Sequence, residues 1–267
     1  MNRLRACFKF AHAALHLAVG WVTIWLKFPG LSPVQRHHRV QVWSAKLLQC
    51  MGVQLIVRGH ASLPGPLMLV SNHISWLDIT ALHAARYCRF VSKADVKHWP
   101  VIGALAAGVG TLFIERESRR DAMRVVHHMA DSLRAGDVLG VFPEGTTSDG
   151  THLLAFHGNL FQAAISANAP VQPVSIAYID LASGQATLAA SFVNDDTLFT
   201  SVWRTLCTQQ LGVVITFGEP QLPQGRDRRV WATQMREEIA KMRAADFTQQ
   251  SSDKTARNNK PDDLNAN

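Results

Sequence analysis

The chain has 267 residues, of which 47 % are hydrophobic, so it can bury a substantial core and is not expected to be disordered as a whole. Lysine and arginine outnumber aspartate and glutamate by 27 to 20, and the net charge of +7 favours an anionic partner such as a membrane surface, a nucleic acid or a phosphorylated substrate. The four cysteines include no Cys-x-x-Cys pair, which argues against a zinc site or a disulfide framework and favours a reducing, cytosol-facing compartment.

The first segment with a predicted role is an apolar run near the N-terminus. Residues 10–26 are mostly apolar and contain no Ala-x-Ala cleavage site, which argues against a secretory signal peptide. At ~1.5 Å per residue the run reaches ~25 Å, short of the ~30 Å hydrocarbon core of a bilayer. Polar positions recur along it at steps of three and four residues, around Gly20: Lys9, His12, His16, Thr23 and Lys27. We therefore expect an amphipathic helix that lies in the membrane interface, ahead of one that spans the bilayer.

A second helix is predicted to begin at Pro33, with Ser32 as its N-cap, and to end near Gly52. It carries a cluster of basic side chains, which beside an interfacial helix favours contact with anionic head groups. These residues are Arg36, His37, His38, Arg39 and Lys46. Residues 1–52 are therefore predicted to form a membrane-docking helical pair, on the cytoplasmic face of the inner membrane.

From Val53 onward, short β-rich runs alternate with helical patterns, which predicts an α/β domain, a mixed sheet flanked by helices, over residues 53–247. Strands are expected at residues 53–57, 67–70, 89–92, 111–114, 138–142, 171–177 and 213–217. Helices are expected at residues 78–86, 118–136, 158–167, 197–210 and 228–244. The tail, residues 248–267, has few apolar residues and is predicted to be disordered.

The most informative stretch follows the second predicted strand, where an apolar run ends in Asn72 and His73 and is followed by Asp78. A neutral imidazole can take a proton from a hydroxyl near neutral pH, and a carboxylate on its other nitrogen would fix the tautomer. A lone histidine beside a turn is more often a structural residue, so the pair alone does not establish catalysis. No Gly-x-Ser-x-Gly elbow occurs, so the proton removed is expected to belong to the substrate and not to a serine nucleophile.

Three further clusters lie in or beside predicted strands. Residues 110–116 end in Arg116, whose guanidinium suits a phosphate or carboxylate. Residues 141–150 place Glu144 and several hydroxyls in a turn that contains glycine, and residues 170–176 enter a strand through a proline. Each cluster alone fits an ordinary loop or surface.

In this order, the clusters resemble the motif blocks of the glycerolipid acyltransferase family, the type of the 1-acyl-sn-glycerol-3-phosphate acyltransferases. Asn72-His73 with Asp78 looks like the block N-H-x-x-x-x-D, and residues 110–116 look like the second block. Phe142-Pro143-Glu144-Gly145-Thr146 resembles the third block and Pro173-Val174 the fourth. The resemblance covers roughly residues 52–220.

The resemblance implies an enzyme that moves a fatty acyl group from a thioester of CoA or acyl carrier protein to the hydroxyl of a lysolipid, with no metal and no other cofactor. His73 would be the general base and Asp78 its partner, while backbone N–H groups near the loop would stabilise the oxyanion. The residues expected to bind or shape the substrate are Asn72, Lys93, Arg116, Glu144, Gly145, Thr146 and Thr147.

One position departs from the family's pattern, because the third block often continues with an arginine where this chain has Thr147. The run from Thr147 to Gly150 looks like that of lyso-ornithine lipid acyltransferases. Lysophosphatidate is expected to be the acceptor because it is the commonest in the family, with lyso-ornithine lipid as the second choice. Two other classes stay open: a membrane-bound thioesterase or lysophospholipase in which His73 activates water, and a non-catalytic lipid-binding protein. A nucleic-acid binder is disfavoured because no matching motif occurs.

Overall fold

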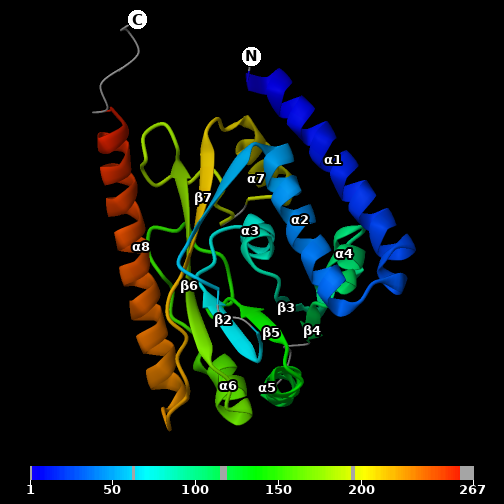
Figure 1. Ribbon diagram of the computed structural model, residues 1–267, viewed down its shortest axis with the longest axis vertical. Coiled ribbons are helices and arrows are strands. Elements are labelled where there is room, and N and C mark those ends of the chain that lie inside the picture. The colour runs from blue at the N-terminus through cyan, green and yellow to red at the C-terminus, as the bar shows by residue number, and fades with distance from the viewer. Residues whose placement is uncertain (1, 62–63, 115–118, 194–195, 259–267) are drawn as a thin grey trace, which may run out of the picture.

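A seven-stranded mixed sheet lies at the centre of the fold, with helices on both faces (Figure 1). The computed structural model describes residues 2–61, 64–114, 119–193 and 196–258. The strands are β1 (Val53–Arg58), β2 (Leu67–Ser71), β3 (Arg89–Lys93), β4 (Leu112–Ile114), β5 (Val138–Val141), β6 (Val171–Asp180) and β7 (Leu211–Phe217). Each lies within a few residues of its predicted position, so the predicted α/β class with a mixed sheet is confirmed.

The strand order, β1-β7-β6-β2-β5-β3-β4, decides which loops meet. β2 is parallel to both of its neighbours, β5 and β6. β3 is likewise parallel to its neighbours, β5 and β4. Only β7 and β1 run the other way, since β7 pairs antiparallel with β6. The carboxyl ends of β2, β5 and β3 therefore lie at one edge of the sheet, which is where open α/β sheets bind ligands.

Alternating side chains of β2 enter two different hydrophobic cores. Leu67 and Leu69 pack with α2 (Pro33–Met51), α3 (Leu77–Ala85) and α7 (Leu198–Cys207) on one face. Met68 and Val70 pack on the other face, among side chains of α5 (Arg119–Arg134), α6 (Phe161–Ala167) and α8 (Arg228–Asn258). All five residues of β2 are buried, as expected for a central strand covered on both faces. The loop that follows β2 is thus held by a rigid element.

Helix α2 begins at the predicted cap. The Ser32 hydroxyl accepts the Gln35 N–H, the Gln35 side chain accepts the Ser32 N–H, and the helix ends at Gly52 with φ of 73°. Its last turns bury Leu47, Leu48 and Met51 against the sheet. α2 therefore packs into the same hydrophobic core as the sheet, and the predicted docking unit of residues 1–52 stays a prediction.

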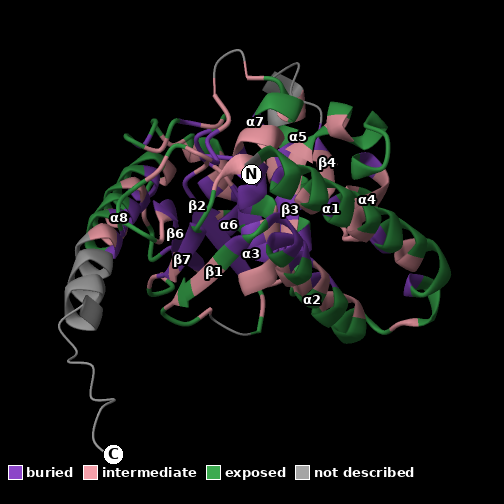
Figure 2. Ribbon diagram, turned by 90° about the horizontal axis from the view of Figure 1, so that it is seen from above, coloured by how far each residue is buried: buried purple, intermediate pink, exposed green. Residues whose placement is uncertain are grey.

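Helix α1 (Asn2–Leu26) turns several of its polar positions toward the rest of the protein. Lys9 Nζ donates to the carbonyls of Leu206 and Thr208, both at 3.2 Å, at the end of α7. The ring of His16 stacks on Trp43, and its Nε2 lies 3.0 Å from the Trp43 carbonyl. Lys9 and His16 of the predicted polar stripe thus hold α1 against α7 and α2, and most of the large apolar residues of α1 are exposed, as the green of its ribbon in Figure 2 indicates.

Two parts of the fold differ from the prediction. The segment after β3 forms a 3-10 helix, Ala94–His98, and the short helix α4 (Ile102–Gly108), neither of which was predicted because the alanines and glycines of this stretch show no helical period. α8 runs to Asn258 instead of ending near Ala244, because no proline or glycine interrupts it. The disorder predicted from residue 248 is corrected to helix over 248–258, and residues 259–267 lie outside the described residues.

Candidate active site

The site begins at Asn72, directly after β2. Its side chain is fully buried, its Nδ2 donates to the Ile176 carbonyl at 2.9 Å, and its Oδ1 accepts the Ile176 N–H at 2.8 Å. Both polar atoms are therefore engaged by the backbone of β6. Asn72 thus fixes the start of the loop that carries His73, and the substrate contact expected of it from the sequence stays a prediction.

The His73 ring is held on two sides. Its Nδ1 lies 2.8 Å from Asp78 Oδ2, and its ring stacks on Phe142 with 4.0 Å between the ring centroids and 9° between the planes. The side chain keeps 18 % of its surface exposed. Since Nδ1 is engaged by the carboxylate, Nε2 is the nitrogen that can accept a proton, and the ring cannot turn away without leaving both partners.

Asp78 lies in the first turn of α3 and is fully buried. Besides His73, its Oδ2 accepts the N–H groups of Ile74 at 2.6 Å and Ser75 at 2.9 Å, while its Oδ1 accepts the Tyr178 hydroxyl at 2.7 Å. Burial, and next the Asp78 carboxylate, raise the pKa of Tyr178 well above its ordinary value, so the phenol stays a neutral donor. Four donors surround one carboxylate, which compensates for taking its charge out of water.

Glu144 comes from the turn after β5, the strand next to β2. Its Oε1 accepts the His73 N–H at 2.8 Å and its Oε2 accepts the Leu154 N–H at 2.9 Å. Burial raises the pKa of Glu144, while the two N–H donors and the charges of His73 and Arg243 act in the opposite direction. Because both oxygens accept backbone N–H groups, Glu144 fixes the backbone of His73 to the backbone of Leu154.

The rest of the third block forms the turn beside His73. Gly145 has a φ of 72° and a Cβ there would lie 3.2 Å from the His157 ring, so glycine suits this position. Thr146 is exposed. The Thr147 hydroxyl donates to the Phe192 carbonyl, and Ser148 N–H donates to the His73 carbonyl at 2.8 Å. The predicted contacts of Glu144, Gly145, Thr146 and Thr147 with substrate stay predictions, and Thr147 already uses its hydroxyl inside the protein.

The two predicted cations differ in what the structure shows of them. Lys93 is exposed at the carboxyl end of β3, two strands from β2, and so lies at the same edge of the sheet as His73. Arg116 follows β4 and lies outside the described residues. Lys93 is therefore available to an anion at this edge, and the predicted role of Arg116 stays a prediction.

Three supporting residues were not predicted from the sequence. Tyr178 bonds to Asp78, Phe142 stacks on His73, and Phe192 receives the hydroxyl of Thr147 while its own N–H donates to the Ile74 carbonyl at 3.0 Å. A tyrosine in a buried strand signals a hidden hydrogen-bond partner, yet the identity of the partner depends on β6 lying next to β2. Nothing in the sequence near Phe192 indicates its contacts.

An acyltransferase family model matches residues 54–177. A lyso-ornithine lipid O-acyltransferase from Pseudomonas aeruginosa is 36 % identical over 245 residues, which cover 90 % of this chain and 93 % of the relative. A 1-acyl-sn-glycerol-3-phosphate acyltransferase from Neisseria gonorrhoeae is 34 % identical over 205 residues, which cover 73 % of this chain and 80 % of the relative. This chain belongs to the same acyltransferase family.

The acyltransferase also has the fold of a solved relative. The crystal structure of the 1-acyl-sn-glycerophosphate acyltransferase PlsC from Thermotoga maritima matches it with a TM-score of 0.68, over 91 % of this chain and 96 % of that chain, at 18 % sequence identity. The family predicted from the motif blocks is thus confirmed, and so is the fold. The enzyme class agrees with the geometry, since the site offers a fixed base whose free nitrogen can take a proton from a hydroxyl.

Proposed function

We propose that this acyltransferase moves a fatty acyl group from a thioester to the hydroxyl of a lysolipid, with His73 as the general base. The observation that carries this assignment is the 2.8 Å contact between His73 Nδ1 and the buried Asp78 carboxylate. It sets the tautomer of the ring, directs Nε2 to the reaction, and stabilises the imidazolium that forms.

The proposed reaction needs no enzyme-bound acyl intermediate. His73 Nε2 removes the proton of the acceptor hydroxyl as the oxygen attacks the thioester carbonyl carbon, and the resulting tetrahedral species then collapses. The C–O bond forms in the attack, the C–S bond breaks in the collapse, and the proton on His73 passes to the departing thiolate. The donor class, a thioester of CoA or acyl carrier protein, is proposed because such an ester is already activated, so that alignment and one proton transfer suffice.

For the acceptor we propose lysophosphatidate first. Lys93 is exposed at the edge of the sheet where His73 lies, so a cation is available for a phosphate near the site. The Neisseria gonorrhoeae relative is named for this reaction. We propose that Arg116, which follows the neighbouring strand, adds the second cation.

Lyso-ornithine lipid is the second candidate, and two observations favour it. Thr147 occupies the position where the family often has an arginine, and its hydroxyl is bound to Phe192, so this loop position supplies no charge. The Pseudomonas aeruginosa relative, matched over 90 % of this chain, is named a lyso-ornithine lipid O-acyltransferase. Supplying both lysolipids at equal concentration to the purified enzyme and measuring the ratio of the two products would decide between them.

We further propose that the acyltransferase docks on one leaflet through the outer side of α1, at the cytoplasmic face of the inner membrane. α1 is the one described helix long and apolar enough to cross a bilayer, over Arg3–Leu26. Its contacts favour docking over spanning, because α1 is bound to the rest of the protein near both ends. Lys9 bonds to the carbonyl of Leu206 on α7, and Ile24 packs on Gly108 of α4. Spanning would break these contacts, whereas docking uses only the outer side.

Replacing the base tests the mechanism. His73→Ala should lower the rate of acyl transfer by about 10²–10⁴-fold, as expected when a general base is lost. Binding to vesicles should not change, because α1 is untouched. Near-normal turnover by this variant would rule out the mechanism. Wild-type enzyme that released fatty acid from labelled acyl-CoA equally fast with and without lysolipid would instead support the thioesterase alternative.

A further inference from the structure

A loop outside the motif blocks joins the two active-site loops. We call residues 187–193 the strap. Its residue Phe192 donates its N–H to the Ile74 carbonyl at 3.0 Å, in the loop between His73 and Asp78, and its carbonyl accepts the Thr147 hydroxyl of the third block. Through Phe192, the strap therefore bridges the loop that carries His73 and the loop that carries Thr147.

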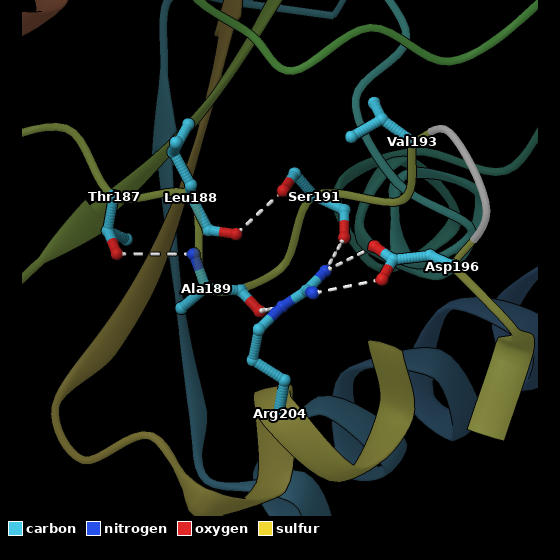
Figure 3. Close-up of a pocket in the computed structure, with 7 residues that line it drawn as sticks. All are labelled: Thr187, Leu188, Ala189, Ser191, Val193, Asp196 and Arg204. Carbon is cyan, nitrogen blue, oxygen red and sulfur yellow. Dashed lines mark hydrogen bonds and ion pairs between the residues drawn. The ribbon is translucent and has the colours of Figure 1, made fainter. Parts of the chain in front are cut away.

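One arginine on α7 fixes the strap. Arg204 Nε donates to the Ala189 carbonyl at 3.2 Å, and its Nη2 donates to the Ser191 carbonyl, so the guanidinium binds the strap twice (Figure 3). The same group forms a two-pronged pair with Asp196, with Nη1 to Oδ1 at 3.2 Å and Nη2 to Oδ2 at 2.8 Å. Figure 3 shows this guanidinium, which lines a pocket together with strap residues, pointing at the two carbonyls and at Asp196.

The position of Arg204 suits a local role more than a global one. Its side chain is 36 % exposed, and ion pairs this close to solvent contribute little to overall stability. The planar fork, however, reaches two carbonyls and a carboxylate together, which a lysine ammonium cannot do with the same geometry. Loss of the arginine should therefore loosen the strap without unfolding the domain.

The direct partners of the catalytic pair lie outside the strap. His73 is held by Asp78 and Phe142, and Asp78 by Tyr178 and two backbone N–H groups. A loosened strap should therefore affect proton removal less than it affects the placement of the His73 loop and the Thr147 loop relative to each other.

We propose that Arg204 is a positioning residue for the lysolipid acceptor, acting by clamping the strap across the His73 loop and the Thr147 loop. The inference rests on the acyl transfer proposed above and adds a residue that no motif block contains. Misplacing a substrate by about 1 Å can cost on the order of 10²-fold in rate, so the clamp has a measurable effect even though Arg204 does not touch the reacting atoms.

The test compares Arg204→Ala and Arg204→Lys with Arg134→Ala as the matched control. Arg134 also pairs with an aspartate, Asp131, and with a backbone carbonyl, that of Ser166, but it lies on α5, away from the strap. Hydrogen exchange of the strap amides, steady-state constants for lysolipid and acyl-CoA, and thioester hydrolysis without acceptor are measured for each variant. Added methylguanidinium probes rescue of Arg204→Ala.

We expect both Arg204 variants to exchange strap amides faster, to raise the acceptor KM by about 10-fold or more, and to keep the acyl-CoA KM and the hydrolysis rate. Methylguanidinium should restore the alanine variant, and Arg134→Ala should match wild type in every measurement. Unchanged strap exchange, or a loss confined to kcat and shared by hydrolysis, would overturn the clamp. Failure of the wild-type enzyme to acylate any lysolipid would refute the proposed function. Hydrogen exchange of the strap amides would still show whether Arg204 holds the strap in place.

Discussion

The Asp78 carboxylate accepts more hydrogen bonds than any other group described in the site, and we expect its partners to differ in their effect on the rate of acyl transfer. Asp78→Asn replaces an acceptor of four donors by an amide that can accept on one atom only, so the His73 tautomer is no longer set. We expect acyl transfer to fall by about 10²–10⁴-fold in this variant. Tyr178→Phe removes one donor and leaves His73 bonded, so its rate should fall by no more than about tenfold. Steady-state kinetics of the two variants check this order, and a Tyr178→Phe loss as large as that of Asp78→Asn would contradict it.

Two substitutions at Thr147 can test which lysolipid head group the enzyme prefers. Thr147→Val removes the bond to the Phe192 carbonyl without adding charge, whereas Thr147→Arg removes the same bond and adds a cation. Comparing the two variants therefore isolates the charge. If lysophosphatidate is the native acceptor, the arginine variant should use it as well as or better than the valine variant. If the acceptor is the aminolipid, its ammonium should be repelled and the product ratio should shift toward phosphatidate. Equal ratios in the two variants would show that the head group does not approach this position.

A buried histidine makes stability depend on pH. Burial lowers the pKa of His83 to about 4, and its Nε2 lies 2.9 Å from the Cys88 carbonyl. Its pKa in the unfolded chain is ~6.5, so the unfolded state binds the proton first and the free energy of unfolding falls as pH drops from ~6.5 through 4. The expected loss is on the order of 3 kcal/mol by pH 4. His83→Gln keeps an N–H donor and should lose stability less over this range, as chemical denaturation at a series of pH values will show. Parallel curves for the two proteins would mean that His83 is not the titrating group.

How far the site follows from the sequence depends on the distance between its members along the chain. His73 and Asp78 are close in sequence, so one turn and the start of one helix bring them together, and their pairing was predicted. Tyr178 and Phe192 reach the same loops from β6 and from the strap. Those contacts depend on strand order and on a loop path that local patterns do not encode.

At the scale of elements, the seven strands were found because apolar runs bounded by turn residues have a clear signature. The order of those strands was not predicted, since parallel neighbours such as β2 and β5 are distant in the chain. Helix α4 was missed because its small residues gave no period, and α8 was cut short because a polar sequence can stay helical when nothing breaks it. The strand order thus came from tertiary packing, which local patterns do not encode.

Helix α1 provides the element-scale prediction. Leu15 and Trp25 lie on its outer side, each 65 % exposed, and in the docked state both would insert into lipid. Replacing both with glutamine should weaken binding to anionic vesicles by at least about 10²-fold, since each buried apolar side chain contributes roughly 1.5–3 kcal/mol. Val230→Gln on α8, across the sheet from α1 (Figure 1), removes an exposed apolar side chain elsewhere and should bind as wild type. Vesicle sedimentation measures both proteins, and equal binding would show that α1 is not the docking surface.

At the scale of the whole molecule, we expect the two N-terminal helices to have different functions, which truncation would separate. Removing residues 1–31 deletes α1, so the protein should stay folded and lose its affinity for vesicles. Removing residues 1–51 also deletes α2 and uncovers the sheet face that Leu47, Leu48 and Met51 protect. Losing a large apolar side chain from a core costs about 2–5 kcal/mol, so three such losses approach the whole stability of a domain, about 5–15 kcal/mol. We expect cooperative thermal unfolding for the first truncation and none for the second, measured by near-ultraviolet circular dichroism. Cooperative unfolding of residues 52–267 would instead show that both helices form the separable docking unit predicted from the sequence.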